Sequence, residues 1–156
     1  MKHPLFILIF ASIIIFQTAS VSAMPTMPPP PEQSREELYH DMFLTLLSKD
    51  IDAAVSNYYA DYLTISPMVY GYMVDVTSAN RVGGYRSFGF TVTLEATPVV
   101  GPHLSVGKDR MIFQIDRSGT KLLDYEHLES HELPNNWKHI VKQNRISLLF
   151  QLIHYT

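Results

Sequence analysis

The spacing of apolar and polar positions changes its period near the middle of the chain. From Ser34 to Pro67, apolar residues recur at steps of three and four, which is typical of an amphipathic helix. Ser34 stands three residues before Glu37, the capping-box spacing that satisfies free amides at a helix start. Pro67 ends the segment, because the residue before proline avoids helical geometry. The predicted buried stripe consists of Leu38, Met42, Phe43, Leu46, Leu47, Ile51, Ala54, Val55, Tyr58 and Tyr62.

After Pro67 the period falls to two, which is typical of half-buried strands. Asn80–Gly84 predicts a turn, and Asp116–Gly119 predicts a tight hairpin connection in which Gly119 is free to adopt a positive φ. The glycines and prolines of Pro98–Lys108 predict a loop. The predicted strands cover residues 70–77, 87–96, 111–115 and 120–128.

One helix followed by four strands with short links predicts an α+β fold, in which the long N-terminal helix packs on a four-stranded antiparallel meander sheet. This arrangement resembles the layout of the cystatin and nuclear-transport-factor folds, which serve unrelated functions. A break at Leu133–Pro134 predicts a further helix start near Trp137. The apolar segment Ile146–Tyr155 is expected to form a helical tail that covers the sheet or one of its edges.

The first residues have the three parts of a secretory signal. Lys2 and His3 precede the apolar run Leu5–Phe16, and small residues follow as far as Ala23. The run is shorter than the about 20 residues that cross a bilayer, so we expect cleavage near Ala23 rather than an uncleaved anchor. The mature protein is then secreted or associated with the cell envelope, without a transmembrane span.

Cleavage divides the chain into four parts. Four successive prolines, Pro28–Pro31, favour an extended spacer without internal hydrogen bonds. The predicted parts are the signal peptide at 1–23, a proline-rich linker at 24–33, an α+β domain at 34–134 and the C-terminal tail at 135–156.

Charge and cysteine content exclude several classes of protein. The predicted signal holds one of the chain's 12 basic residues and none of its 15 acidic ones, so the mature chain has a formal charge of 11 − 15 = −4. The sequence contains no cluster of Lys or Arg, which argues against nucleic acid as a partner. The chain has no cysteine, which excludes a disulfide framework and a lipid-anchoring cysteine.

Several short stretches of the chain together resemble one family. They are Glu36–Tyr39 with Asp41–Met42, Asn57–Tyr59, Gly84–Phe88, Thr97–Pro98, Gly101–His103, Val106–Arg110 and Glu132–Pro134. They resemble the domain-of-unknown-function family numbered 3888, small exported proteins of spore-forming Gram-positive bacteria. The resemblance covers most of the predicted mature chain. It implies a shared fold and export, and it implies no activity.

One loop combines side chains that could act as a hydrolase site. His103 would be the general base, with Asp109 or Glu95 to orient it. Arg86 or Lys108 would stabilise negative charge. In the alternative interpretation, the glycines and proline of the loop shape a turn, and Asp109 pairs with a neighbouring cation.

His127 and His131 are the candidates for metal binding, because on a helix both rings would face the same side. The segment is more typical of a strand, in which residues four apart lie about 13 Å from each other, too far for one ion. Ser105 and Ser130 lie near histidines but within no recognisable catalytic motif. The sequence therefore predicts no cofactor.

Exposed tyrosines offer an apolar body with a polar tip, suited to a peptide or a glycan. The leading interpretation is therefore a non-enzymatic binding or structural module of the envelope or exterior, whose partner is an envelope protein, a peptide or a glycan. The hydrolase is the first alternative and the metal-binding protein the second. The binding candidates are Tyr58, Tyr59, Tyr62 and Tyr85.

Overall fold

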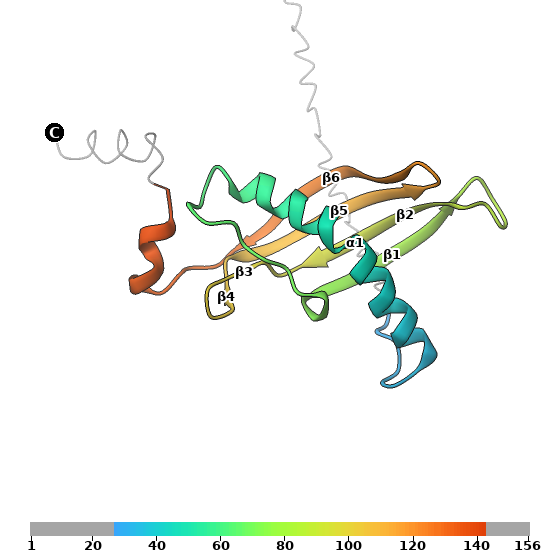
Figure 1. The fold of residues 1–156 in the computed structure, drawn as a ribbon, viewed down its shortest axis with the longest axis horizontal. Coiled ribbons are helices and arrows are strands. Elements are labelled where there is room, and N and C mark those ends of the chain that lie inside the picture. Colours follow the sequence, from blue (N-terminus) through green and yellow to red (C-terminus); the bar gives the residue numbers. More distant parts are fainter. Residues whose placement is uncertain (1–26, 143–156) are drawn as a thin grey trace, which may run out of the picture.

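The computed structural model describes residues 27–142 and confirms an α+β fold with one long helix and a four-stranded antiparallel sheet (Figure 1). The predicted signal peptide at 1–23 and the segment Ile146–Tyr155 lie outside the described residues. Among residues 27–142, no helix has the length and apolar composition needed to cross a bilayer. The elements are α1 (Arg35–Tyr59), η1 (Gly71–Met73), β1 (Val74–Val82), β2 (Gly89–Ala96), β3 (Val99–Val100), β4 (Leu104–Ser105), β5 (Gly107–Asp116), β6 (Gly119–Ser130) and η2 (Asn135–Ile140).

Helix α1 begins as predicted and ends earlier. The Ser34 hydroxyl accepts a hydrogen bond from the Glu37 amide at 3.0 Å, which confirms the cap. The helix stops at Tyr59 instead of including Tyr62. The chain leaves the helix there because it pairs with the segment after η2: Leu63 bridges Val141, and the Thr64 amide donates to the carbonyl of Ile140 at 2.8 Å.

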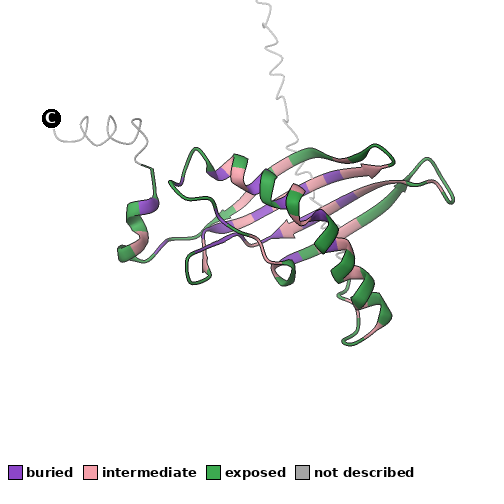
Figure 2. Cartoon of the chain, in the orientation of Figure 1, coloured by how far each residue is buried: buried purple, intermediate pink, exposed green. Residues whose placement is uncertain are grey.

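The buried stripe of α1 differs from the predicted one at its N-terminal half. Leu38, Met42 and Leu46 are exposed, Leu46 to 80%. The first turns of α1 extend past the edge of the sheet at β1, so nothing in the described chain covers them (Figure 2). The helix residues that are buried against the sheet are Leu44, Leu47, Ile51, Ala54, Val55 and Tyr59.

The sheet has the strand order β1-β2-β5-β6, so its strands follow one another as a meander. The predicted alternation of β2 is confirmed, with Val92, Leu94 and Ala96 buried under α1. β1 is displaced towards the C-terminus relative to the prediction, because Gly71–Met73 forms a 3-10 turn. The connection to β2 accordingly begins at Gly83 and Gly84, whose φ angles of 90° and 94° favour glycine.

The segment Pro98–Lys108, predicted as a loop, contains the short hairpin of β3 and β4 and the start of β5. Its turn is fixed by packing against η2. A Cβ atom on Gly101 would overlap the ring of Trp137, so only glycine allows this approach. η2 is a 3-10 helix of six residues at the place where the sequence predicts a helix start near Trp137.

Candidate functional site

Asp109 is the one charged side chain that is fully buried among residues 27–142, with 0% exposure. Its position follows from the alternation of β5, which turns Asp109 and Met111 towards α1. A buried carboxylate is costly unless it is hydrogen-bonded. Both of its oxygens have a partner: the Tyr59 hydroxyl donates to Oδ2 at 3.1 Å, and His127 Nδ1 lies 2.6 Å from Oδ1.

Two irregularities in the pairing of β5 with β6 position the partners of Asp109: the first aligns His127, and the second aligns Ser130. The hairpin begins with Asp116 opposite Gly119, and a regular register would place Asp109 opposite Glu126. Opposite Ile112 and Phe113, β6 contains one extra residue. This bulge shifts the register by one position and places His127 opposite Asp109. A second shift, between Lys108 and Asp109, leaves Leu128 unpaired and turns Ser130 onto the same face as His127.

The second shift completes a continuous chain of hydrogen bonds. The Ser130 hydroxyl lies 2.8 Å from His127 Nε2. Because a carboxylate only accepts hydrogen bonds, Nδ1 of His127 carries the proton that it shares with Asp109. In the neutral ring, Nε2 is then the acceptor of the Ser130 hydroxyl proton, and the order of the groups is serine, histidine, aspartate.

Gly107 makes room for these side chains. A Cβ atom at this position would lie 2.7 Å from the Tyr59 hydroxyl and 2.8 Å from Cε1 of His127, and it would also overlap the carbonyl oxygen of Glu129. Real Cβ atoms do not approach other atoms so closely. Glycine at the first residue of β5 is therefore a condition of the Asp109–His127 contact.

Tyrosine rings enclose the histidine. Tyr58 stacks on Tyr125, with ring centroids 4.9 Å apart, and on His127, with centroids 5.2 Å apart. Burial, together with the charge and hydrogen bond of Tyr62, raises the pKa of Tyr58 to about 12. Burial and the negative charge of Asp109 also raise the pKa of Tyr59 and of Tyr125. These phenols consequently stay protonated, and that of Tyr59 donates its proton to Asp109.

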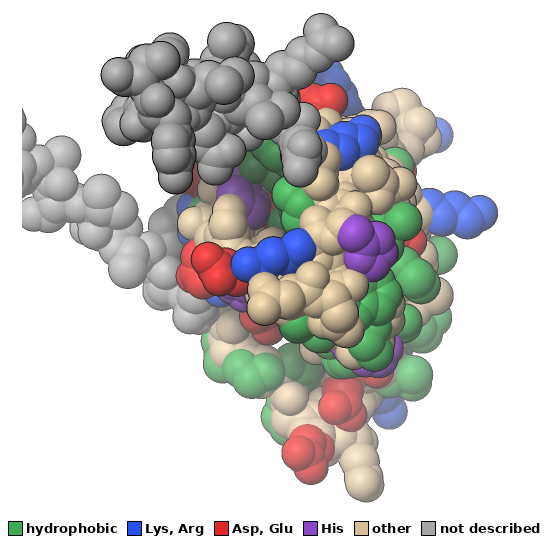
Figure 3. Space-filling view, turned by 90° about the vertical axis from the view of Figure 1, so that its left-hand side faces the viewer, with side chains coloured by type: hydrophobic (Ala, Val, Ile, Leu, Met, Phe, Trp, Pro, Cys, Tyr) green, Lys and Arg blue, Asp and Glu red, His purple; other side chains and the backbone are tan. Residues whose placement is uncertain are grey.

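A cavity of about 400 Å³ opens beside this cluster, where the end of α1, the end of β6 and η2 meet. Figure 3 views the molecule from this end, where histidine side chains reach the surface beside hydrophobic ones. Lys138 is the one lysine or arginine among the described residues that line it. The lining residues are Tyr58, Tyr59, Tyr62, Leu63, Val106, His127, Ser130, His131, Glu132, Leu133, Lys138 and Val141.

His131 belongs to a separate network. Its Nδ1 lies 2.7 Å from the Ser105 hydroxyl, and its Nε2 lies 3.5 Å from the exposed carboxylate of Glu129. His127 lies in β6, as the strand interpretation of this segment predicts. Each ring has both nitrogens in contact with protein groups, and residues 27–142 contain no group of three side chains placed to hold a metal ion.

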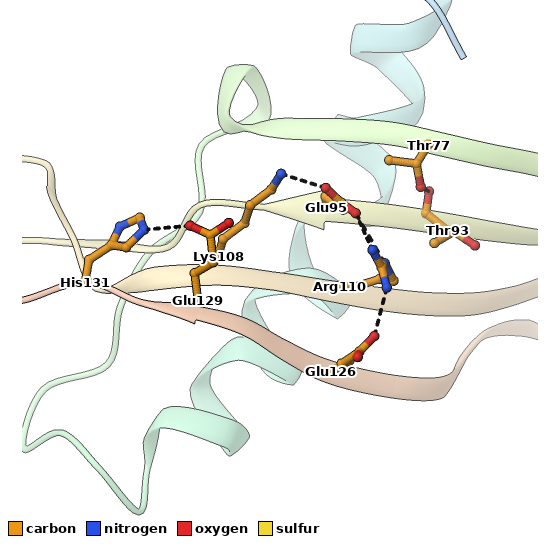
Figure 4. A network of polar contacts seen from close by, with 8 residues as sticks. All are labelled: Thr77, Thr93, Glu95, Lys108, Arg110, Glu126, Glu129 and His131. Carbon is orange, nitrogen blue, oxygen red and sulfur yellow. Dashed lines mark hydrogen bonds and ion pairs between the residues drawn. The ribbon is translucent and has the colours of Figure 1, made fainter. Parts of the chain in front are cut away.

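Glu95 and Lys108 lie on the face of the sheet away from α1 (Figure 4). Asp109 lies on the other face, because neighbouring residues of a strand alternate. Glu95 pairs with Lys108 at 2.7 Å and with Arg110 at 2.8 Å, and Arg110 also pairs with Glu126 at 2.9 Å. The hydrogen bonds from Lys108 and Arg110 hold the pKa of Glu95 below its ordinary value, although partial burial opposes this. These charges form a row across the strands and stabilise the sheet. They do not form a site around His103.

His103 lies in the turn between β3 and β4, with a φ of 61°, and its ring packs on Tyr70 at 4.8 Å. Arg86 and Tyr85 lie in the connection between β1 and β2, at the end of the sheet opposite the cavity, and Tyr85 is 95% exposed. The structure therefore does not assemble the predicted loop site, because Asp109 is hydrogen-bonded to His127 and Tyr59 and not to His103. Of the predicted tyrosines, Tyr58, Tyr59 and Tyr62 converge on the cavity, and Tyr85 does not.

Ser130 and Tyr125 are the members of the cluster that sequence analysis did not select. Residues three apart on a regular strand face opposite sides, so the spacing of His127 and Ser130 argues against a contact. Only the bulge at Leu128 brings them together. The Tyr125 hydroxyl is buried and has no hydrogen-bond partner among the described residues. The pattern of apolar positions predicts neither the contact of Ser130 with His127 nor the buried hydroxyl of Tyr125.

The comparisons with known proteins identify a family and nothing beyond it. Residues 39–129 match the model of the family described as a protein of unknown function, DUF3888. No curated protein and no solved structure matches the chain. The matched range covers α1 from Tyr39 onwards, the strands β1, β2 and β5, and β6 as far as Glu129, and it therefore ends before Ser130.

Proposed function

Since the chain belongs to the DUF3888 family, whose description assigns no function, we propose from its geometry that the domain binds a small ligand in the cavity beside His127. The observation that carries the proposal is that the cavity opens directly onto the ring of His127, which the buried Asp109 holds in place. A buried, hydrogen-bonded carboxylate contributes little to stability compared with an apolar residue of similar size. The role that we assign to Asp109 is therefore to hold the ring of His127 towards the cavity.

The lining of the cavity indicates the chemistry of the ligand. Its walls are mainly apolar and aromatic, with Tyr62, Leu63 and Val141 among them, and Glu132 adds a carboxylate. Lys138 adds a cation that favours a carbonyl or carboxylate oxygen. A ligand with an apolar body and one such oxygen-bearing head fits both features. A volume of about 400 Å³ lies within the range of small-molecule sites.

The signal pattern of residues 1–23 supports a role outside the membrane, in the envelope or exterior. A peptide end combines an apolar side chain with a carboxylate, and it is the ligand in this setting that matches the cavity most closely. The sequence-based interpretation of a tyrosine-rich binding surface is thus kept, with Tyr58, Tyr59 and Tyr62 as its members.

The test is a binding measurement on two matched variants. Short peptides and carboxylate fragments are screened against the full-length chain by ligand-observed NMR, and the affinity of the best binder is measured by calorimetry. Val141→Trp fills the cavity, whereas Val82→Trp makes the same change at a half-exposed valine at the other end of the sheet. We expect Val141→Trp to weaken binding by about tenfold or more, a loss of about 1.4 kcal/mol. We expect Val82→Trp to leave it unchanged. Equal effects of the two variants would contradict the proposal.

A further inference from the structure

Ser130, His127 and Asp109 form a hydrogen-bonded chain that ends at the cavity. The distances are 2.8 Å from the Ser130 hydroxyl to Nε2 and 2.6 Å from Nδ1 to Asp109 Oδ1. In this order, the aspartate fixes the tautomer of the histidine, and the unprotonated ring nitrogen can take the proton of the serine hydroxyl. Such a chain is recognised by its geometry and not by its order in the sequence.

The surroundings hold the chain in this arrangement. Asp109 is fully buried, so solvent screens its attraction to His127 only weakly. Tyr59 fixes its second oxygen, and Tyr58 stacks on the ring of His127. Asp109 and Tyr58 thus restrict the movement of the His127 ring. Ser130, in contrast, is exposed and lines the cavity where a ligand would lie.

We propose that the cavity hydrolyses esters, with Ser130 as nucleophile, His127 as general base and Asp109 as the positioning residue. This rests on the proposed ligand-binding cavity. Ser130 Oγ forms a bond to the carbonyl carbon of the ester while Nε2 of His127 takes its proton. The bond from that carbon to the alcohol oxygen then breaks, and His127 returns the proton to the leaving alcohol. Water then forms a bond to the acyl carbon on Ser130 while Nε2 of His127 takes its proton. The bond from that carbon to Oγ breaks, and His127 returns the proton to Oγ, which releases the carboxylic acid and restores the serine.

The lining defines the substrate class. The apolar walls suit an acyl group of small size, and Lys138 is the cation that faces the negative charge formed on the carbonyl oxygen. An alcohol leaves more readily than an amine, and a single lysine on an exposed helix gives modest stabilisation. Esters of small apolar carboxylic acids are therefore the expected substrates.

The second serine–histidine pair serves as an internal control. Ser105 lies 2.7 Å from His131, but Ser105 does not line the cavity. The acid beside His131 is Glu129, which is 62% exposed and 3.5 Å away. The two pairs share their chemical groups and differ in burial and access, so reactivity is expected at Ser130 alone.

Covalent labelling with a fluorophosphonate probe tests the nucleophile on the full-length chain, with mass spectrometry to locate the adduct. We expect the adduct on Ser130, its loss in Ser130→Ala, and labelling of Ser105→Ala at the rate of the unmodified chain. His127→Gln keeps an amide that can hydrogen-bond to Asp109 and removes the base, so it should slow labelling by about 100-fold or more. Hydrolysis of a nitrophenyl butyrate ester should follow the same order. Melting temperatures verify that each variant is folded.

Nitrogen NMR shifts of His127 test the role of Asp109. In the unmodified chain the proton should reside on Nδ1. Asp109→Asn presents an amide that can donate to the ring, so the proton should move to Nε2 and labelling should slow. A merely structural role would not move this signature. If the unmodified chain already carries the proton on Nε2, the proposal is wrong, whether or not the variant folds.

The remaining outcomes separate this inference from the proposed binding function. No adduct, or an adduct on Ser105 or elsewhere, overturns the hydrolase. If peptides or carboxylates nevertheless bind and Val141→Trp weakens them, the binding function stands without catalysis. If Ser130 is labelled and Val141→Trp leaves the labelling rate unchanged, the cavity is not the route to the serine, and the proposal as stated fails.

Discussion

At the scale of single residues, the cluster around Asp109 depends on small details of its neighbours. The carboxylate is satisfied by Tyr59 and His127, and both reach it only because Gly107 has no side chain. The alternation of β5 would accept an apolar residue at position 109 as readily as it accepts Met111. The presence of a carboxylate there is thus explained by its partners and not by packing.

Gly107→Ala tests this dependence. The added methyl group would press against the Tyr59 hydroxyl and the His127 ring, and overpacking of this kind costs about 1–3 kcal/mol. Chemical denaturation of the variant should show this loss. Gly71→Ala is the control, because its Cβ would meet nothing within 4 Å, and the stability should change by less than about 1 kcal/mol. A stable Gly107→Ala protein with intact ligand binding would contradict the account.

The same residues show how far the sequence predicts the site. The sequence predicts Asp109 or Glu95 as the carboxylate that orients a histidine, but with His103 as that histidine, because Asp109 and His103 lie close in the chain. Its partner, His127, is 18 residues away and is aligned only after the register shift in β6. Bulges depend on the pairing of two strands, so neither strand's own pattern predicts them.

At the scale of elements, the sequence predicts those features that depend on residues close to one another in the chain. The cap at Ser34, the alternation of β2 and the turn at Asp116–Gly119 are all present, because each is decided by residues within a few positions of one another. The end of α1 and the hairpin of β3 and β4 were not predicted, since each is set by contacts with distant segments: Leu63 with Val141, and Met68 with Val99.

The displaced stripe of α1 gives a matched pair of substitutions. Leu47 is 3% exposed under the sheet, whereas its neighbour Leu46 is 80% exposed. Leu47→Ala should lower the free energy of unfolding by about 2–5 kcal/mol, because it leaves a cavity in the core. Leu46→Ala should change it by less than about 0.5 kcal/mol. Denaturant titrations of the two variants measure the difference, and similar losses would show that the first turns of α1 are covered.

The charged row of the sheet predicts a dependence on pH. The hydrogen bond from Lys108, and then Arg110, lower the pKa of Glu95 in the folded chain. A carboxyl group of this kind stabilises the fold at pH values above its unfolded pKa, and the contribution is lost as the pH falls through the folded pKa. At neutral pH, Glu95→Gln should cost about 1 kcal/mol. This difference should begin to shrink as the pH falls through the ordinary glutamate pKa of about 4.3, and it should vanish once the pH is below the lowered pKa of folded Glu95.

Unfolding curves of the unmodified chain and of Glu95→Gln across this range check the prediction. Glu126→Gln serves as the control, because Glu126 is exposed and pairs with Arg110 alone. Its effect should be smaller at every pH. A Glu95→Gln difference that grows as the solution becomes more acidic would have the wrong sign.

At the scale of the whole molecule, the two ends of the sheet differ in character. At one end, α1, β6 and η2 enclose the cavity with the buried Asp109–His127 pair. At the other end, the connection between β1 and β2 exposes Tyr85 and Phe88 without enclosing a buried charge. The composition of the chain contains no trace of this asymmetry, because it results from the way antiparallel strands bring distant residues to one end.

Chemical-shift mapping of the full-length chain during titration with a bound peptide or carboxylate tests the central claim most directly. The account predicts that the amide signals that move belong to the cavity, among them Leu63, Val106, Ser130 and Leu133, and that those around Tyr85 stay in place. Shifts confined to the connection around Tyr85, or to the turn of His103 beside Tyr70, would contradict the account and move the binding site to another part of the sheet.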